Sequence, residues 1–205
     1  PDAALDAAIA AAEAADLPPI SVSPPQGQLL HLLVKLVNAK SVLEIGTLGA
    51  YSTIWMARAL APGGRLLTLE ADPTHADVAR SNLERAGIAD RVTLRLGRAL
   101  ETLPTLSPAD GAPFDVIFID ADKPPLADYF VEALRLSRAG TLIIIDNVIR
   151  DGAVADPSSR DASVQGVRRL NDRIAATPNV EATSIQTVGA KGYDGFTLVR
   201  VDENV

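Results

Sequence analysis

The chain has 205 residues, of which 47% are hydrophobic and 22% charged, the composition of a globular domain with a sizeable core. Its net charge of -7 disfavours a nucleic-acid partner, and the absence of cysteine excludes disulfides, thiolate metal ligands and a cysteine nucleophile. Residues 1–17 lack the basic residues of a targeting peptide and no apolar run is long enough to span a bilayer, so we expect a cytoplasmic protein without a membrane partner.

Residues 1–40 predict two helices joined by a loop. The Ala-rich opening segment indicates a helix that ends before Pro18, and its few large apolar residues require it to pack on the domain or on a second copy of the chain. The segment "ISVSPPQG" is expected to be a loop. Apolar residues recur with a helical period over residues 28–39.

From residue 41 onward, apolar strands alternate with helical segments. Strands are expected at 41–45, 64–70, 91–97, 114–120 and 141–147, and helices at 51–60, 72–87, 126–140 and 164–177, with a short helical piece ending at Leu103. Such alternation predicts a parallel sheet with helices on both faces. Two last strands, 180–188 and 195–201, flank a Gly-rich turn and make the final strand antiparallel. The fold class is therefore α/β, a single domain over 1–205 with a mostly parallel seven-stranded sheet.

Acidic residues end four of the first five strands: Glu44, Glu70, Asp120 and Asp146. The carboxyl ends of parallel strands lie at one edge of an open sheet, where ligands bind. Carboxylates gathered there repel one another unless a cation or ligand uses them, although any one of them could instead cap a helix. The pattern favours a functional edge.

The segment "LEIGTLGAYS", residues 43–52, links the first strand to a helix. Its glycines, Gly46 and Gly49, let the backbone approach a ligand and aim helix amides at it. A third glycine is missing and Glu44 precedes the turn, which favours a cationic or zwitterionic ligand over a pyrophosphate. Glu70 stands where an acid that binds ribose hydroxyls is expected.

The segments "DADK", residues 120–123, and "DN", residues 146–147, follow the fourth and fifth strands. Neighbouring strands lie about 4.8 Å apart, so Asp120, Asp146 and Asn147 can converge if these two strands pair. Three oxygen ligands suit Mg²⁺, Mn²⁺ or Ca²⁺. Lys123 is then the candidate general base, and the alternative is a solvated loop lysine.

In combination these residues resemble the cation-dependent O-methyltransferases, which include catechol and caffeoyl-CoA O-methyltransferases. The likeness runs from "VSPPQGQLL" through "LEIGTLGAYS", "LLTLEADP", "FIDADK" and "IIIDNV" to "KGYDGFTL". It implies a Rossmann-like class I methyltransferase fold, S-adenosylmethionine as cofactor, a divalent cation and a homodimer. The implied substrate is a catechol-like small molecule whose vicinal hydroxyls chelate the metal.

The resemblance also assigns roles to individual residues. Residues 1–40 would supply N-terminal helices and a loop that covers the cofactor. The metal ligands would be Asp120, Asp146 and Asn147, and the catalytic residues Lys123 and Asp120. The residues implied to contact the cofactor are Val22, Glu44, Gly46, Leu48, Tyr51, Ser52, Glu70, Ala99, Asp120 and Ala121.

Two departures from the family pattern stand out. Arg150 occupies a position near the acceptor where plant relatives usually carry an aromatic residue, which favours an acceptor with a polar or anionic substituent. Gly49-Ala50 replaces the commoner Thr-Gly before Tyr51 and Ser52.

Two other functions are compatible with part of the pattern. A glycine turn followed by Glu70 would also suit an NAD-dependent oxidoreductase, but this leaves "DADK" and "DN" unexplained. A non-catalytic domain that binds the cofactor as a sensor would leave Lys123 and the metal ligands unexplained.

Overall fold

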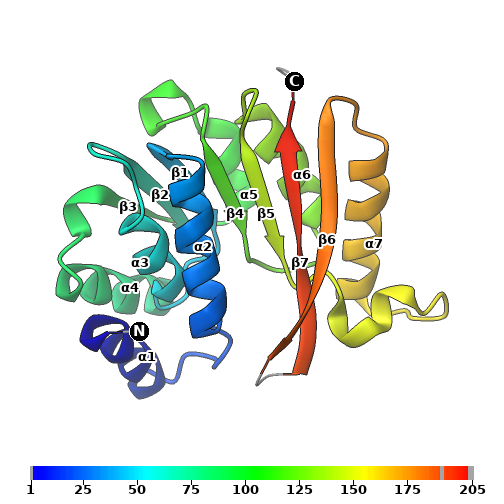
Figure 1. Cartoon of the computed structure of the whole chain (residues 1–205). Coiled ribbons are helices and arrows are strands. Elements are labelled where there is room, and N and C mark those ends of the chain that lie inside the picture. Colours follow the sequence, from blue (N-terminus) through cyan, green and yellow to red (C-terminus); the bar gives the residue numbers. More distant parts are fainter. Residues whose placement is uncertain (1, 190–191, 203–205) are drawn as a thin grey trace. The chain divides into compact units, whose positions relative to one another are not determined.

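The structure, a computed structural model, describes residues 2–189 and 192–202. Within these residues seven strands form a sheet in the order β3-β2-β1-β4-β5-β7-β6 (Figure 1). β7 is antiparallel to both of its neighbours, whereas β2 is parallel to β1 and β3, and β4 to β5. The predicted sheet with its antiparallel last strand is confirmed. The chain divides into two compact units, Pro1–Ala112 and Pro113–Val205, and the single domain stays a prediction.

The first unit contains the strands β1, β2 and β3. Their register pairs Ser41 with Arg65 and Leu66 with Val92, so the carboxyl ends of the three strands lie at one edge. The elements of this unit are α1 (Ala3–Ala14), α2 (Pro24–Leu36), β1 (Ser41–Ile45), α3 (Tyr51–Ala57), β2 (Arg65–Glu70), α4 (Pro73–Arg85), η1 (Ala89–Arg91), β3 (Val92–Leu96), α5 (Ala99–Thr102), η2 (Leu103–Thr105) and η3 (Pro108–Asp110).

The second unit contains the strands β4, β5, β7 and β6. Ile119 pairs with Ile145 at the carboxyl ends of β4 and β5, whose side chains form a buried apolar layer. In Figure 1, α7 runs alongside β6 at the edge of this part of the sheet. The elements of this unit are β4 (Val116–Ile119), α6 (Leu126–Arg135), β5 (Leu142–Asp146), η4 (Arg150–Ala155), α7 (Ala162–Ala175), β6 (Val180–Gly189) and β7 (Gly192–Val201).

Several helix boundaries differ from those predicted, and the start of α2 and the end of α6 differ most. α2 begins at Pro24, inside the expected loop, because proline loses no hydrogen bond in a first helical turn and the Ser23 hydroxyl accepts from the Gln26 amide at 3.4 Å. α6 ends at Arg135 rather than near Gly140. There the Ser137 hydroxyl donates to the Ala133 carbonyl at 2.6 Å, which competes with continuation of the helix.

The final hairpin has a shorter connection than the Gly-rich sequence predicts. Tyr193 and Asp194, expected in the turn, belong to β7 and pair with Val188 and Thr187. The ladder continues to the pair of Gly189 with Gly192. Residues 190–191 of the expected turn lie outside the described residues.

The opening helix α1 packs on its own unit. Leu5, Ala8 and Ala12 are buried, and the side-chain amide of Asn82 in α4 donates to the carbonyls of Ala8 at 3.3 Å and Gly49 at 2.9 Å. α1 is thereby tied to α4 and to the glycine turn after β1. This contact satisfies the expectation that the helix packs on the domain.

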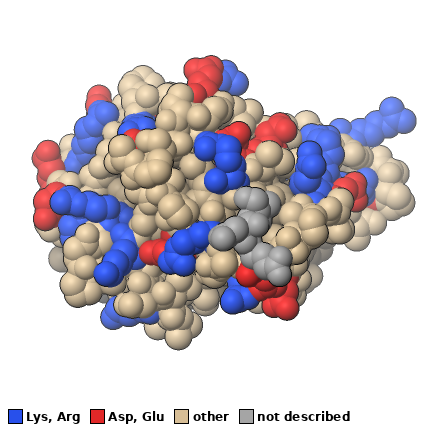
Figure 2. All heavy atoms as spheres, turned by 90° about the horizontal axis from the view of Figure 1, so that it is seen from above, with Lys and Arg blue, Asp and Glu red and all other residues tan. Residues whose placement is uncertain are grey.

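The outer surface carries both signs of charge. On the face shown in Figure 2, Lys and Arg side chains lie interspersed with Asp and Glu and with neutral surface. No helix among the described residues has the length and apolar character needed to cross a membrane.

Candidate active site

The turn between β1 and α3 has an unusual backbone. Gly46 has a φ of 98°, Leu48 of 50° and Ala50 of 65°. A residue with a Cβ in this left-handed region costs roughly 1 kcal/mol or more, and such strain concentrates at functional sites. Ala50 therefore has a backbone conformation that glycine adopts more easily, and the commoner family pattern has glycine at this position.

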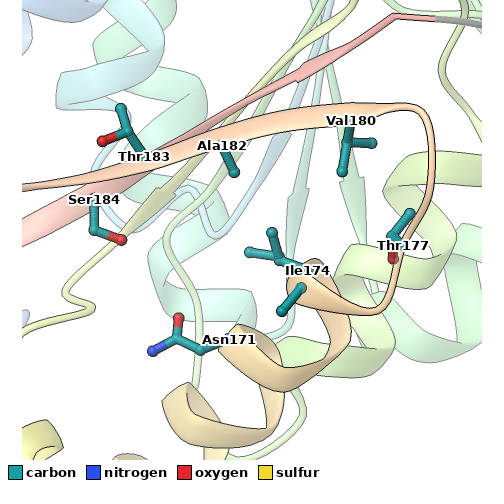
Figure 3. Close-up of a pocket in the computed structure, with 8 residues that line it drawn as sticks. Asn171, Ile174, Thr177, Val180, Ala182, Thr183 and Ser184 are labelled. Atoms are coloured by element: carbon teal, nitrogen blue, oxygen red, sulfur yellow. The ribbon is translucent and has the colours of Figure 1, made fainter.

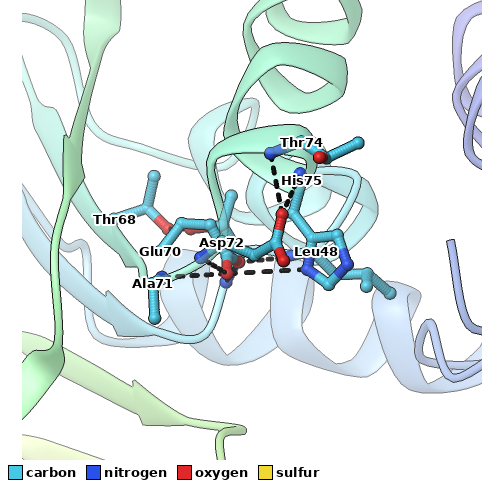
Figure 4. Close-up of polar contacts among 8 residues, drawn as sticks. Leu48, Thr68, Glu70, Ala71, Asp72, Thr74 and His75 are labelled. Carbon is cyan, nitrogen blue, oxygen red and sulfur yellow. Dashed lines mark hydrogen bonds and ion pairs between the residues drawn. The ribbon is translucent and has the colours of Figure 1, made fainter. Parts of the chain in front are cut away.

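Glu70, at the end of β2, ties this turn to the start of α4 (Figure 4). Its Oε2 atom accepts from the amides of Thr47 at 3.2 Å and Leu48 at 2.7 Å. Its Oε1 atom accepts from the amides of Ala71 and Asp72, both at 2.9 Å. Four amide donors match the roughly four acceptor positions of a carboxylate. The turn was expected to aim its amides at a ligand, whereas two of them are bonded to Glu70, so a ribose hydroxyl would have to exchange with these bonds.

Glu44 lies beneath the turn rather than on the surface of a site. Its side chain is fully buried and accepts from the hydroxyls of Ser52 at 2.6 Å, Thr53 at 2.5 Å and Thr68 at 2.7 Å. The Thr68 hydroxyl is also 2.6 Å from that of Thr47 in the turn. The contact of Glu44 with a cofactor stays a prediction, and its buried carboxylate holds the hydroxyl of Ser52, which is itself a predicted cofactor residue.

The remaining predicted cofactor residues of the first unit lie around the same strand ends. Gly46 and Leu48 are partly exposed in the turn, while Tyr51 and Ser52 are buried in the first turn of α3. Ala99 opens α5 after β3 and is partly exposed, whereas Val22, before α2, is buried.

In the second unit, β4 and β5 bring two acids to neighbouring strand ends. The parallel pair of Ile119 with Ile145 places Asp120 and Asp146 at equivalent positions, one residue further along each strand. Asp146 is buried, and its Oδ1 atom accepts from the Asn147 amide at 2.8 Å. The predicted pairing of these strands is confirmed.

Lys123 is a buried lysine rather than a solvated one. Only 7% of its surface is exposed, and its Nζ atom lies 3.2 Å from Oδ1 of Asp120. A buried ammonium requires such a partner, because desolvation of an unpaired charge is costly. Ala121, between the two, is partly exposed.

The predicted metal ligands can be compared with the donors that divalent cations require. Among the described residues, no three His, Cys, Asp or Glu side chains are grouped to hold a metal ion. The predicted set of ligands instead combines the carboxylates of Asp120 and Asp146 with the side-chain amide oxygen of Asn147. Hard oxygen donors of this kind fit Mg²⁺, Mn²⁺ or Ca²⁺ and leave positions for other oxygen ligands.

The loop after β5 stores backbone strain. Asn147, Arg150 and Asp151 have φ values of 58°, 54° and 53°, all in the region that glycine favours. Three left-handed residues within one loop are stable only where contacts with the surrounding structure compensate for their cost.

The residues that hold this loop come from β7 and were not predicted. The Asp194 carboxylate accepts from the amides of Ile149 at 2.9 Å and Arg150 at 3.0 Å, and the Tyr193 hydroxyl donates to the Asp151 carbonyl at 2.5 Å. Both residues stand in the "KGYDGFTL" motif, whose sequence alone indicates no role for them. Lys191 of that motif lies outside the described residues.

Asp122 also has a structural partner. The Tyr129 hydroxyl of α6 donates to its Oδ1 atom at 2.6 Å. This bond ties the segment between Asp120 and Lys123 to the helix that follows it.

A separate hollow of about 370 Å³ lies between α7 and β6 (Figure 3). Asn171, Ile174 and Thr177 line one side, and Val180, Ala182 and Ser184 the other. These β6 residues belong to the first half of a strand that runs parallel to β5. The hollow is therefore at the opposite end of the strands from Asp120 and Asp146.

The strand order, the acid-bearing glycine turn and the acids at the strand ends define a class I methyltransferase type of α/β protein. Residues 4–201 match the family described as O-methyltransferase. The catechol O-methyltransferases of Niastella koreensis and Mycobacterium tuberculosis are 56% and 53% identical to this chain; each alignment covers 98% of it, and 90% and 89% of the relatives.

Solved structures agree with this assignment. The O-methyltransferase from Bacillus cereus in complex with SAH has a TM-score of 0.96 at 54% identity, covering 98% of this chain and 92% of the other. The O-methyltransferase of tomaymycin synthesis from Streptomyces achromogenes, in complex with SAM, has a TM-score of 0.94 at 53% identity, with coverages of 98% and 91%. The chain therefore belongs to the O-methyltransferase family, and the resemblance inferred from its sequence is confirmed.

Proposed function

We propose that this chain transfers a methyl group from S-adenosylmethionine to one hydroxyl of a catechol-like aromatic molecule, with the help of a divalent cation. The observation that carries the proposal is the pairing of β4 with β5, which places Asp120 and Asp146 at equivalent strand ends, with buried Lys123 against Asp120. Identities of 53–56% to two catechol O-methyltransferases support the same acceptor class.

The methyl donor would be bound mainly by the carboxyl ends of β1, β2 and β3. Glu70 would hold the ribose by exchanging amide hydrogen bonds for ribose hydroxyls, and Glu44 would fix the Ser52 hydroxyl from below. The relatives solved with SAH and SAM each match 98% of the chain, which supports this cofactor. The remaining proposed contacts are Val22, Gly46, Leu48, Tyr51, Ala99, Asp120 and Ala121.

The acceptor would be prepared by residues of the second unit. Asp120, Asp146 and Asn147 would hold the cation, which when bound lowers the pKa of a coordinated hydroxyl and orients it. Lys123, 3.2 Å from Asp120, would as a neutral amine accept the proton of the reacting hydroxyl, and Asp120 would stabilise the resulting ammonium. The partly exposed Arg150 would favour an acceptor with a polar or anionic substituent.

A methylation assay with labelled S-adenosylmethionine and a panel of catechols and hydroxycinnamoyl thioesters tests the proposal. We expect EDTA to abolish turnover and added Mg²⁺, Mn²⁺ or Ca²⁺ to restore it. Asp146→Ala should lose the response to metal, and Lys123→Ala should lower kcat about 100-fold or more. Asp156→Ala, a change in an exposed loop, is the matched control and should retain full activity.

Three results would contradict separate parts of the proposal. Turnover that survives both EDTA and Asp146→Ala would remove the cation. Full turnover of Lys123→Ala at neutral pH would remove the base. Failure to methylate any compound of the panel, with S-adenosylmethionine bound, would reject the acceptor class.

A further inference from the structure

The N-terminal half of α7 lies directly against the backbone that follows Lys123. A Cβ atom built on Gly166 would lie 2.0 Å from the Lys123 carbonyl oxygen and 2.9 Å from Cα of Pro124. Real Cβ atoms do not approach backbone atoms so closely, so any side chain at Gly166 would displace the Lys123–Pro124 backbone.

Arg169, one helical turn further along α7, makes a second contact with the same backbone. Its Nη2 atom donates to the Pro124 carbonyl at 2.9 Å. Residues three apart share one face of a helix, so Gly166 and Arg169 contact the Lys123–Pro124 segment together. Gly166 lets the Lys123–Pro124 backbone lie close to the helix, and the hydrogen bond from Arg169 fixes the orientation of that backbone.

Lys123 needs this support because a lysine side chain is flexible. Ordering it costs up to about 2 kcal/mol of conformational entropy, and its bond to Asp120 is a single contact at 3.2 Å. With the backbone held by α7, the short segment from Asp120 to Lys123 has few conformations left. The ammonium then stays beside the Asp120 carboxylate.

The neighbouring arginine secures a different loop. Nε of Arg168 donates to the Val154 carbonyl at 3.0 Å, and its Nη2 atom donates to the carbonyl of Asp156. Both acceptors lie in or just after η4, not in the segment that carries Lys123. Two adjacent arginines of α7 thus hold two separate loops.

We propose that Gly166 and Arg169 are positioning residues, which hold the Lys123–Pro124 backbone so that Lys123 remains buried on Asp120. Neither residue contacts the reacting atoms. The effect of this positioning on catalysis rests on the proposed function, whereas the positioning of Lys123 does not.

Amine labelling followed by peptide mass spectrometry tests the positioning without any assay of turnover. A limiting amount of an acylating reagent should modify Lys123 slowly, with the exposed Lys35 and Lys40 as internal references. In Arg169→Ala we expect the rate at Lys123, relative to these references, to rise roughly five- to tenfold, as expected for the loss of one hydrogen bond. Arg169→Lys, which can still donate to the Pro124 carbonyl, should restore most of the protection.

Two other variants on α7 serve as controls. Arg168→Ala and Arg173→Ala each remove one positive charge from the helix without touching the Pro124 carbonyl. Both should leave Lys123 as protected as in the unmodified chain. Equal labelling of Lys123 in all three alanine variants, or no change in Arg169→Ala, would overturn the proposal.

Steady-state kinetics tests the catalytic consequence. Arg169→Ala should lower kcat about 10- to 100-fold with little change in KM for S-adenosylmethionine, because a displaced base weakens the chemical step and not donor binding. Gly166→Ala should act in the same direction, and if it fails to fold Arg169→Ala still decides the matter. An unchanged kcat in Arg169→Ala overturns the effect on catalysis. If the unmodified chain methylates no catechol, the proposed function fails, while labelling still decides whether α7 holds Lys123.

Discussion

Two acidic side chains, Glu70 at the carboxyl end of β2 and Asp194 near the amino end of β7, accept hydrogen bonds from several backbone amides each. Glu70 accepts four amide hydrogen bonds, and Asp194 accepts three, from Ile149, Arg150 and Gly195. An amide left without an acceptor in a buried setting costs about 1–3 kcal/mol. Each of these carboxylates therefore fixes the shape of a loop with a few short bonds.

Asp194→Ala is predicted to destabilise the loop that carries Asn147. We expect the free energy of unfolding to fall by about 2 kcal/mol, because three part-buried amides lose one shared acceptor. Urea denaturation followed by circular dichroism measures the change. Asp194→Asn keeps one acceptor oxygen and should lose less. Asp156→Ala, in an exposed loop, is the control, and an equal loss there would contradict the prediction.

At the scale of elements, α4 depends on a charged cap. Oδ1 of Asp72 accepts from the amides of Thr74 at 2.7 Å and His75 at 3.2 Å, and Pro73 occupies the first helical position. The hydrogen bond from the His75 amide lowers the pKa of the Asp72 carboxyl below its ordinary value of 3.8; desolvation, the next-largest effect, opposes this shift, and the hydrogen bond from the Thr74 amide adds to it. The cap is therefore strongest when this carboxyl is ionised.

Asp72→Ala is predicted to destabilise the chain in a pH-dependent way. A carboxyl whose pKa is lowered by folding contributes stability above its unfolded pKa and loses it as the pH falls through the lowered, folded value. The unfolding midpoint of Asp72→Ala should thus lie below that of the unmodified chain near neutral pH, and the difference should shrink below 3.8. Thermal unfolding at stepped pH measures this. Asp77→Ala, in the same helix but outside the cap, should show no such trend, and a difference that persists undiminished in acid would contradict the prediction.

At the scale of the whole molecule, ligand binding should separate a methyltransferase from a nicotinamide enzyme. A ligand at about 100 times its Kd stabilises the folded state by about 2.7 kcal/mol, which for a chain of this length raises Tm by roughly 5–10 °C. We expect this shift with SAH and none with NAD at equal concentration. Differential scanning fluorimetry measures both. A larger shift with NAD would contradict the assignment of the glycine turn.

We also predict a homodimer that uses the outer face of α2. Gly27, Leu30 and Val34 are buried on one face of this helix, whereas Leu32 and Leu36 on another are 48% and 80% exposed. Exposed leucines four residues apart form an apolar stripe, and a two-fold axis allows the same stripe to pack against itself in a second copy.

Sedimentation at micromolar concentrations tests the dimer. The unmodified chain should have twice the mass of one chain, and the double variant Leu32→Glu with Leu36→Glu should be monomeric. Val188→Glu serves as control, because Val188 is an 84% exposed apolar residue on β6, an element of the second unit. A monomeric unmodified chain would refute the prediction, and a monomeric Val188→Glu would move the interface to β6.

The sequence by itself determined the order and type of the main elements and the family to which the chain belongs. Apolar periodicity is a local property, and acids that follow parallel strands share one edge by geometry alone, so the order of residues suffices to place Asp120 and Asp146 at the same edge. That they are neighbours there depends on the pairing of β4 with β5, which the structure supplies. Boundaries such as the end of α6 were missed because a single side chain, Ser137, decides them.

Only the tertiary structure decided what each of these residues contacts. Glu44 is buried under three hydroxyls, Glu70 is bonded to amides of two loops, and Gly166 and Arg169 hold the backbone after Lys123. Most of these partners lie between 8 and 45 residues apart along the chain. No local pattern of polarity encodes such contacts, because they arise when separate elements pack and their polar groups must find partners out of water.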